Sequence, residues 1–85
     1  MTTSLGTLIV TGAGRSIGAA VAKLAAANGW DVAVNYGKSK GPADAVVAEI
    51  EAAGGRAVAI QGDMAIEDDI IRLFETAERE LGPIK

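Results

Sequence analysis

The stretch Thr7-Leu8-Ile9-Val10-Thr11-Gly12-Ala13-Gly14-Arg15-Ser16-Ile17-Gly18 decides the fold of this chain. It starts with an apolar run, Leu8 to Val10, in which hydrophobic and polar residues do not alternate. Such a run is typical of a strand buried on both faces of a parallel sheet. Gly12 and Gly14 follow, and they allow the backbone to turn sharply and to approach a ligand closely. The stretch therefore predicts a strand, a glycine-rich turn and the start of a helix.

The helix is expected to begin close to Ser16. Apolar residues recur beyond it at helical spacing, namely Ile17, Ala20, Val21, Leu24 and Ala25. A helix N-terminus offers unpaired N–H groups and the positive end of the helix dipole, and both suit a phosphate group. The backbone N–H groups around Ser16, Ile17 and Gly18 are the candidate ligands of this phosphate. The simpler alternative is a glycine-rich turn that only connects a strand to a helix.

Strand and helix patterns alternate along the rest of the chain. The predicted elements are a helix over 17–28, a strand over 31–35, a helix from 42 or 43 to 53, a strand over 57–60 and a helix over 67–81. In the last helix, the side chains expected to face inward are those of Ile70, Leu73, Phe74, Ala77 and Leu81. Residues 36–42 are expected to form a polar loop. The order β-α-β-α-β-α predicts an α/β fold, one half of a Rossmann-type doubly wound parallel sheet in the strand order 3-2-1.

Composition excludes several classes of function. The 85 residues contain no cysteine and no histidine, so disulfides, thiolate chemistry, Cys/His zinc sites and a histidine base are excluded within them, and no metal site is expected. The formal net charge of −3 argues against nucleic-acid binding. No apolar run approaches the roughly 20 residues that span a bilayer. Residues 1–4 carry no basic side chain and lead into no signal-peptide core, so a cytoplasmic location is expected.

The glycine-rich stretch resembles the Thr-Gly-x-x-x-Gly-x-Gly signature of the short-chain dehydrogenase/reductase family. Thr11, Gly12, Ile17 and Gly18 match it, whereas Ser16 stands where that family usually has its middle glycine. Further similarities lie in Asn35-Tyr36, in Gly62-Asp63-Met64 and around Gly82-Pro83, so the resemblance covers nearly the whole chain. It is strongest to carrier-protein ketoreductases and sugar dehydrogenases. The resemblance implies a parent oxidoreductase that transfers hydride between a nicotinamide cofactor and a small carbonyl or alcohol substrate.

The residues around the end of the second strand predict which cofactor is preferred. NAD-specific sites place an acid there to hold the ribose 2′-hydroxyl, and this chain has Asn35, followed by Tyr36. Arg15, Lys38 and Ser39 offer positive charge and a hydroxyl to a 2′-phosphate. NADP(H) is therefore the expected cofactor, with NAD(H) possible. The alternative is that Arg15 and Lys38 are ordinary solvated loop charges.

Asp63 and Met64 follow the third strand, at the edge where ligands of open α/β sheets bind. The resemblance implies that Asp63 contacts the adenine amino group and that the backbone of Met64 borders the ring. The alternative for Asp63 is a residue that forms a turn or caps a helix.

No catalytic residue is expected within the chain. Tyr36 and Lys40 match the Tyr-x-x-x-Lys pattern of the family's catalytic pair, but that pair works from a helix and these residues are predicted to lie in a loop. The resemblance implies that the catalytic serine and the helical Tyr-x-x-x-Lys lie beyond Lys85. Residues 1–85 are thus expected to be the N-terminal part of a single dinucleotide-binding domain. The expected partners are the remainder of the polypeptide or a cleaved companion chain, in a homo-oligomer that is a dimer or a tetramer. The competing hypothesis is a non-catalytic Rossmann module that senses dinucleotides.

Overall fold

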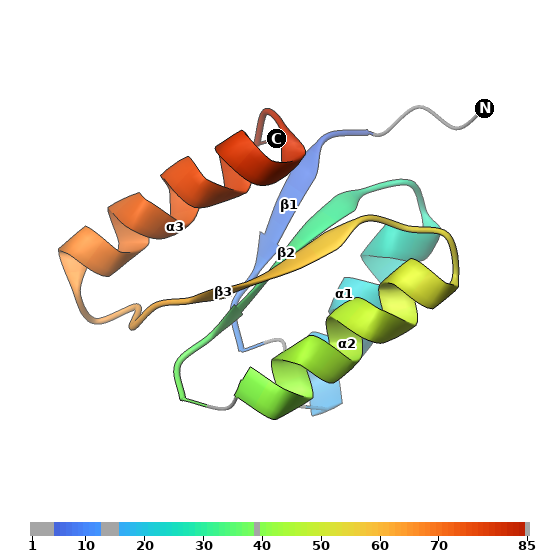
Figure 1. Cartoon of the computed structure of the whole chain (residues 1–85), viewed down its shortest axis with the longest axis horizontal. Helices are drawn as coiled ribbons and strands as arrows, with labels where there is room; N and C mark the ends of the chain where they lie inside the picture. The colour runs from blue at the N-terminus through green and yellow to red at the C-terminus, as the bar shows by residue number, and fades with distance from the viewer. Residues whose placement is uncertain (1–4, 13–15, 39, 85) are drawn as a thin grey trace.

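The computed structural model describes residues 5–12, 16–38 and 40–84. Six elements alternate along the chain: β1 (Thr7–Val10), α1 (Ser16–Ala27), β2 (Asp31–Tyr36), α2 (Lys40–Ala52), β3 (Ala57–Gln61) and α3 (Glu67–Leu81). The strands form one parallel sheet in the order β1-β2-β3 (Figure 1). This arrangement confirms the predicted half of a Rossmann-type sheet, because the order 3-2-1 is the same sheet read from its other edge.

The central strand β2 divides the core into two layers. Its Val32 and Val34 pack with α1 and α2 on one face, whereas Ala33 packs with α3 on the other, as expected when successive strand side chains point to opposite faces. Figure 1 shows α1 and α2 on one side of the sheet and α3 on the other. The first core consists of Val10, Ala22, Val32, Val34, Ala43, Val46 and Ile50, and the second of Ala33, Ile60, Leu73 and Ala77.

Helix α1 turns its alanine side to the core. Ala22 is fully buried, whereas Ile17 and Leu24 are 82% and 66% exposed. The apolar spacing predicted the helix correctly, but the larger residues of that pattern point away from the described part of the sheet. Short alanine side chains let the helix approach the strands closely. Leu8 and Ile9 are half-buried rather than buried, because β1 lies at the edge of the three-stranded sheet.

Helix α2 begins earlier than the sequence pattern predicts. It starts at Lys40 rather than at 42 or 43, and Tyr36 is the last residue of β2, so the expected loop over 36–42 is shorter. Pro42 is tolerated within the first helical turn, where its missing N–H would have no partner inside the helix. The Lys40 Nζ lies 2.7 Å from the Asp44 carboxylate one turn later, and this ion pair supports the early start.

Helix α3 has the bounds that the sequence predicts. Glu67, Asp68 and Asp69 occupy its first turn, where negative charge suits the helix dipole, and Gly82 ends it with a φ of 114°. One part of the prediction is wrong, because Phe74 is 46% exposed while its neighbour Leu73 is fully buried. Only a narrow stripe of α3 contacts the sheet, and adjacent helical residues point about 100° apart.

The chain returns to the open edge of β1 after α3. Ile84 forms a parallel bridge with Thr7, and the Thr7 N–H donates to the Pro83 carbonyl at 3.0 Å. The Thr7 hydroxyl donates to the Gly82 carbonyl at 3.0 Å. Figure 1 shows this end of the chain beside the start of β1. Residues 83 and 84 therefore lie where a fourth strand of the predicted sheet would pair.

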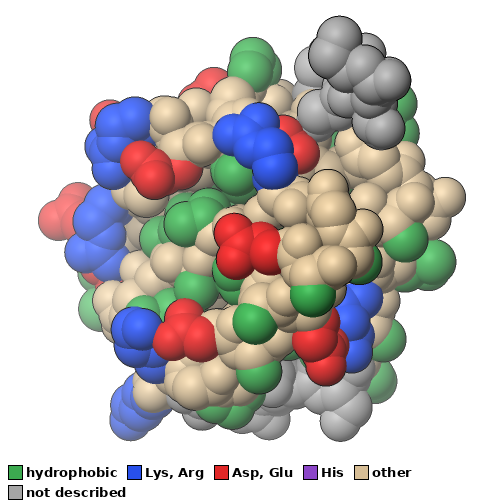
Figure 2. All heavy atoms as spheres, turned by 45° about the vertical axis from the view of Figure 1, so that its right-hand side comes forward, with side chains coloured by type: hydrophobic (Ala, Val, Ile, Leu, Met, Phe, Trp, Pro, Cys, Tyr) green, Lys and Arg blue, Asp and Glu red, His purple; other side chains and the backbone are tan. Residues whose placement is uncertain are grey.

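The surface carries mixed charge. On the face drawn in Figure 2, basic and acidic side chains are interspersed, and hydrophobic side chains reach the surface between them. Exposed hydrophobic residues occur on α1 and α3, for example Val21 on α1 and Ile71 on α3. Over the described ranges, no helix combines the length and the apolar character that a membrane crossing requires.

Candidate functional site

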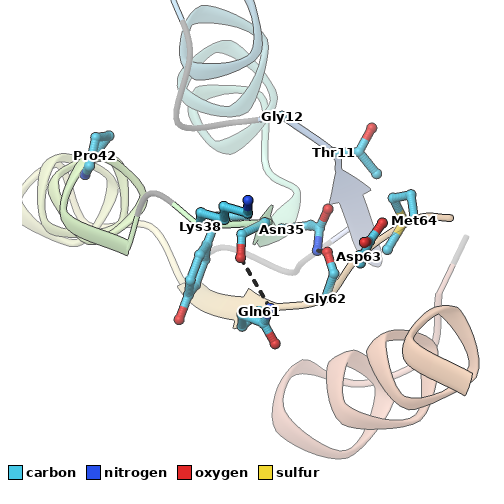
Figure 3. Close-up of a pocket in the computed structure, with 11 residues that line it drawn as sticks. Thr11, Gly12, Asn35, Lys38, Pro42, Gln61, Gly62, Asp63 and Met64 are labelled. Carbon is cyan, nitrogen blue, oxygen red and sulfur yellow. Dashed lines mark hydrogen bonds between the residues drawn. The ribbon is translucent and has the colours of Figure 1, made fainter. Parts of the chain in front are cut away.

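The carboxyl ends of all three strands open into one cleft of about 600 Å³ (Figure 3). The residues lining it are Thr11, Gly12, Asn35, Tyr36, Gly37, Lys38, Pro42, Gln61, Gly62, Asp63 and Met64. Ligands of open α/β sheets bind at this edge. The structure thus brings together six of the residues predicted from sequence: Gly12, Asn35, Tyr36, Lys38, Asp63 and Met64.

The remaining predicted site residues come from positions 14–18 and 39 of the sequence. Gly14, Arg15 and Ser39 fall outside the described residues. Ser16 is the first residue of α1, and the placement of its side chain also lies outside the description. Ile17 and Gly18 complete the first turn of α1, where Ile17 is exposed and Gly18 is half-buried.

Gly12 shapes the β1 side of the cleft. Its φ of +65° lies in the left-handed region, which favours glycine. A Cβ built on Gly12 would meet no atom within 4 Å, and the same holds for Gly37 across the cleft. The backbone is therefore accessible at the ends of β1 and β2, as close approach of a phosphate or ribose to the main chain requires.

Asn35 is buried at the end of β2, with 3% of its surface exposed. Its Nδ2 donates to the carbonyls of Ile60 and Gly62, each at 3.2 Å. Figure 3 shows the amide nitrogen directed toward Gly62. Asn35 stands where the sequence analysis expects NAD-specific sites to have an acid, and in the structure its amide nitrogen is engaged by the backbone carbonyls of Ile60 and Gly62.

The two lysines near the cleft differ in their surroundings. Lys40 is hydrogen-bonded to Asp44, and this bond, together with the negative charge of Asp44, raises the pKa of Lys40. Lys38 is exposed and lines the cleft, and within the described ranges no carboxylate lies in ion-pair distance of its Nζ. Lys38 is thus the cation that faces the cleft without a protein counter-ion in this part of the chain.

Asp63 forms the turn that the sequence analysis gave as its alternative role, and it also lines the cleft. Its Oδ1 accepts a hydrogen bond from the Ala65 N–H at 2.9 Å, which forms a turn. Its own N–H donates to the Asp69 carboxylate at 2.9 Å, so α3 holds the residue in place. Asp63 remains exposed and lines the cleft together with the half-buried Met64. The structural alternative for Asp63 therefore does not remove it from the cleft.

Gln61 and Arg72 form a support that the sequence analysis missed. Gln61 Nε2 donates to the Gly37 carbonyl at 3.0 Å, the dashed line in Figure 3. Arg72 on α3 donates to the backbone carbonyl of Gln61 at 2.9 Å and lies 3.5 Å from the Asp69 carboxylate. The loop after β2 is thereby tied to β3 and α3. The one available signal was the position of Gln61 directly before Gly62-Asp63.

The residues around the cleft can be compared with the family's catalytic pair and with a metal site. Tyr36 ends β2 and Lys40 begins α2, so these residues do not share a helical face as the family's catalytic pair does. Among the described residues, no group of histidine, cysteine, aspartate and glutamate side chains could hold a metal ion. The described lining residues offer hydrogen bonds, a positive charge and exposed backbone.

The profile of the short chain dehydrogenase family matches residues 6–85. The chain belongs to this family. Among its curated relatives, L-rhamnose 1-dehydrogenase (NAD(P)(+)) of Sphingomonas is 50% identical over 74 residues, which cover 82% of this chain and 29% of the relative. The 3-oxoacyl-[acyl-carrier-protein] reductase of Synechocystis is 52% identical over 68 residues, covering 80% of this chain and 28% of the relative. The predicted resemblance to sugar dehydrogenases and carrier-protein ketoreductases is confirmed.

A solved structure supports the same assignment. The blue fluorescent protein from a metagenomic library, determined in complex with NADPH, superposes with a TM-score of 0.89 at 41% sequence identity. The superposition covers 99% of this chain and 35% of that protein. This chain therefore spans about a third or less of the length of the relatives that it matches.

Proposed function

We propose that residues 1–85 bind NADP(H) as the cofactor-binding part of a short chain oxidoreductase. The observation that carries the proposal is the cleft at the carboxyl ends of three parallel strands, bordered by the accessible backbone of Gly12 and Gly37 and by the cation of Lys38. The NADPH in the similar blue fluorescent protein supports a nicotinamide cofactor here. Because the described lining residues combine accessible backbone with a cation, they fit a phosphorylated dinucleotide.

The residues divide into three groups by the part of the cofactor they would hold. The first turn of α1, with Ser16, Ile17 and Gly18 and the preceding Gly14, would bind the pyrophosphate through backbone N–H groups. Tyr36, Lys38, Ser39 and Arg15 would surround the ribose and its 2′-phosphate. Asp63 and Met64 would border the adenine. The chemistry that NADP(H) supplies when bound is hydride transfer to or from a carbonyl or alcohol carbon.

The preference for NADP(H) over NAD(H) follows from charge. On the β2 side of the cleft, the described residues Tyr36 to Lys38 include a lysine and no acid. An acid about 4 Å from a 2′-phosphate would weaken binding by roughly 1 to 4 kcal/mol per charge pair, and a lysine there strengthens it. NAD(H) can still occupy such a site, with lower affinity.

Titration calorimetry of the full-length polypeptide that carries this chain tests the preference. NADP⁺ should bind at least about tenfold more tightly than NAD⁺, a difference of roughly 1.4 kcal/mol. Arg15→Ala should lose most of that difference, because it removes a positive charge from the glycine-rich turn. Arg79→Ala is the matched control, since Arg79 lies in the last turn of α3 beside Glu80. Equal affinities of the unmodified protein for the two cofactors would refute the preference.

The domain organisation is part of the same proposal. We propose that residues 1–85 are the N-terminal part of one Rossmann domain whose next strand pairs with β1 through the segment that begins at Pro83 and Ile84. The parent is then a cytoplasmic homo-oligomer, a dimer or a tetramer, that acts on a small carbonyl or alcohol substrate. Its remaining sheet, or a companion chain, would cover the exposed Ile17 and Leu24.

Sedimentation and thermal unfolding of residues 1–85 alone test this organisation. Beyond the bridge between Thr7 and Ile84, the apolar edge of β1 and the exposed side of α1 predict self-association or incomplete folding, because an unprotected strand edge pairs with other chains. A monomer that unfolds cooperatively at micromolar concentration would contradict the proposal. Cell fractionation and sedimentation of the full-length polypeptide test its location and its oligomeric state.

A further inference from the structure

The carboxyl end of β2 contains a buried polar side chain, Asn35, whose amide nitrogen donates to the protein's own backbone. Asn35 is 3% exposed, and its Nδ2 bridges two carbonyls that flank Gln61 in sequence, those of Ile60 and Gly62, at 3.2 Å each. A backbone hydrogen bond joins the same two segments, since the Gly62 N–H donates to the Tyr36 carbonyl at 3.0 Å. The end of β3 is thus held against β2 by one side chain and by the main chain.

The chemistry of this contact requires an amide. A carbonyl only accepts hydrogen bonds, so the group that faces two carbonyls must supply two protons, as the NH₂ of asparagine does. A carboxylate of the same shape supplies none and carries a negative charge toward both oxygens. A Cβ built on Gly62 would lie 3.5 Å from Asn35 Nδ2, an ordinary contact distance, so the hydrogen bonds of Asn35 do not depend on glycine at position 62.

The segment that Asn35 holds leads directly into the adenine side of the cleft. Gly62 is buried, and the next residues are Asp63 and Met64, which line the cleft. From α3, the Asp69 carboxylate holds the Asp63 N–H at 2.9 Å. Gly62 and Asp63 are therefore fixed from two sides, by Asn35 below the cleft and by Asp69 beside it.

We propose that Asn35 is a positioning residue for the Gly62–Met64 turn and does not discriminate between NADP(H) and NAD(H). The proposal rests on the proposed function of the cleft. It differs from the expectation drawn from the sequence, in which the absence of an acid at position 35 itself sets the preference. Discrimination then lies with the side chains that face the ribose, of which Tyr36 and Lys38 are the described candidates on β2 and its loop.

Two substitutions separate these views. Asn35→Asp keeps the shape but replaces the donors with a charge, and Asn35→Leu keeps the approximate volume without donors or charge. Both leave the carbonyls of Ile60 and Gly62 without their side-chain partner. A positioning role predicts that each variant weakens NADP⁺ and NAD⁺ by the same factor, about tenfold, so that the ratio of the two affinities stays within about twofold.

Control variants separate positioning from general loss of stability. Asn28→Asp makes the same chemical change at an exposed amide that donates to the Leu24 carbonyl at 2.8 Å. Asn28 lies between α1 and the amino end of β2, at the opposite end of the sheet from the cleft, so both affinities should stay unchanged. Asp31→Asn breaks the contact with Arg56 at the opposite end of β2 and should lower the melting temperature without changing either affinity. Amide resonances of Gly62, Asp63 and Met64 should shift in Asn35→Leu, whereas those of Ala22 and Val46 in the α1–α2 core should not.

The experiment is titration calorimetry of the full-length protein and its variants with NADP⁺ and NAD⁺. Equal proportional losses in Asn35→Asp and Asn35→Leu support the positioning role. A shift of the ratio toward NAD⁺ by tenfold in Asn35→Asp, or unchanged affinities in Asn35→Leu, would overturn it. If Asn35→Asp does not fold, Asn35→Leu decides alone. Failure of the unmodified protein to bind either dinucleotide would instead refute the proposed function of the cleft.

Discussion

The two ends of the sheet are built from the same three strands but use polar residues differently. At the amino end, the buried Asp31 pairs with Arg56 at 3.2 Å, and Arg56 also donates to the Glu80 carbonyl at 3.2 Å. The Leu5 N–H donates to the Gly29 carbonyl at 2.9 Å. Polar groups there satisfy one another and join β2, β3 and the end of α3 into one cross-linked structure.

At the carboxyl end, polar groups are left facing a cleft. Lys38 and Asp63 are exposed at its rim, and Gly12 and Gly37 present backbone without side chains. Asn35 is the exception, since it is buried there and bonded within the protein. From this difference we expect that substitutions at the amino end of the sheet change stability alone, whereas substitutions at its carboxyl end change dinucleotide affinity.

The largest expected effect comes from a matched pair of glycines. Gly12 and Gly54 both have positive φ, +65° and +92°, and a Cβ on either would meet no atom within 4 Å. Valine at either position should destabilise the protein by about 2 kcal/mol, because a β-branched residue is strained in the left-handed region. Gly12→Val should also weaken NADP⁺ binding about a hundredfold. Thermal unfolding and calorimetry measure the two effects.

Gly54→Val is the control for that strain, since Gly54 follows α2 at the amino end. Its affinity for NADP⁺ should match that of the unmodified protein. Similar losses of affinity in both variants would show that strain, not the position of Gly12 in the cleft, causes the effect.

The next effect concerns the amino end. Asp31→Asn should lower the free energy of unfolding by about 1–2 kcal/mol, since it removes the charge-assisted hydrogen bond that the exposed Arg56 donates to the buried Asp31 carboxylate. Chemical denaturation measures the loss. Glu49→Gln, which breaks the exposed pair with Lys23, is the control and should change stability by about 0.5 kcal/mol or less. A change in the NADP⁺ affinity of Asp31→Asn would contradict the proposed difference between the amino and carboxyl ends of the sheet.

A smaller effect separates the two lysines. Lys38→Gln should weaken NADP⁺ binding about fivefold, roughly 1 kcal/mol, and leave NAD⁺ binding unchanged, because the loss concerns one exposed charge near the 2′-phosphate. Lys40→Gln should leave both affinities unchanged, since Lys40 is engaged by Asp44. Calorimetry at low ionic strength measures these differences best, because salt screens exposed charges. Equal effects of the two substitutions would assign the preference to overall charge rather than to Lys38.

The smallest expected effect concerns the support from α3. Arg72→Met removes the donor to the Gln61 carbonyl, and Gln61 in turn holds the Gly37 carbonyl. Because these bonds are exposed, the loss in NADP⁺ affinity should be about twofold, near 0.5 kcal/mol. Arg79→Met is the control on the same helix. A loss as large as that in Lys38→Gln would show that the loop depends on α3 more than its exposed bonds indicate.

Sequence reasoning predicted the elements well because their signals are local. The acids of the first turn and Gly82-Pro83 gave α3 its observed bounds. The sequence pattern predicts the start of α2 too late, because Gly41 and Pro42 favour a loop, whereas the Lys40–Asp44 ion pair supports a helix that begins at Lys40. Burial was harder to predict, because the sheet contacts only one stripe of each helix. Phe74 is therefore exposed although its spacing fits an inward face.

The site was predicted as a set of residues but not as a set of contacts. Parallel strands bring their carboxyl ends together, so Gly12, Tyr36 and Asp63 were expected to meet and do. The direction of a side chain at a strand end depends on the neighbouring strand. The sequence of β2 alone therefore could not indicate that Asn35 bonds to Ile60 and Gly62.

The central claim is that the carboxyl end of this sheet binds NADP(H). A crystal structure of the full-length polypeptide with NADP⁺ tests it most directly. We predict the adenine beside Asp63 and Met64, the 2′-phosphate within ion-pair distance of Lys38, and the pyrophosphate at the first turn of α1, with the Asn35 amide still bonded to Ile60 and Gly62. A dinucleotide bound elsewhere, or a 2′-phosphate directed away from the loop after β2, would contradict the account.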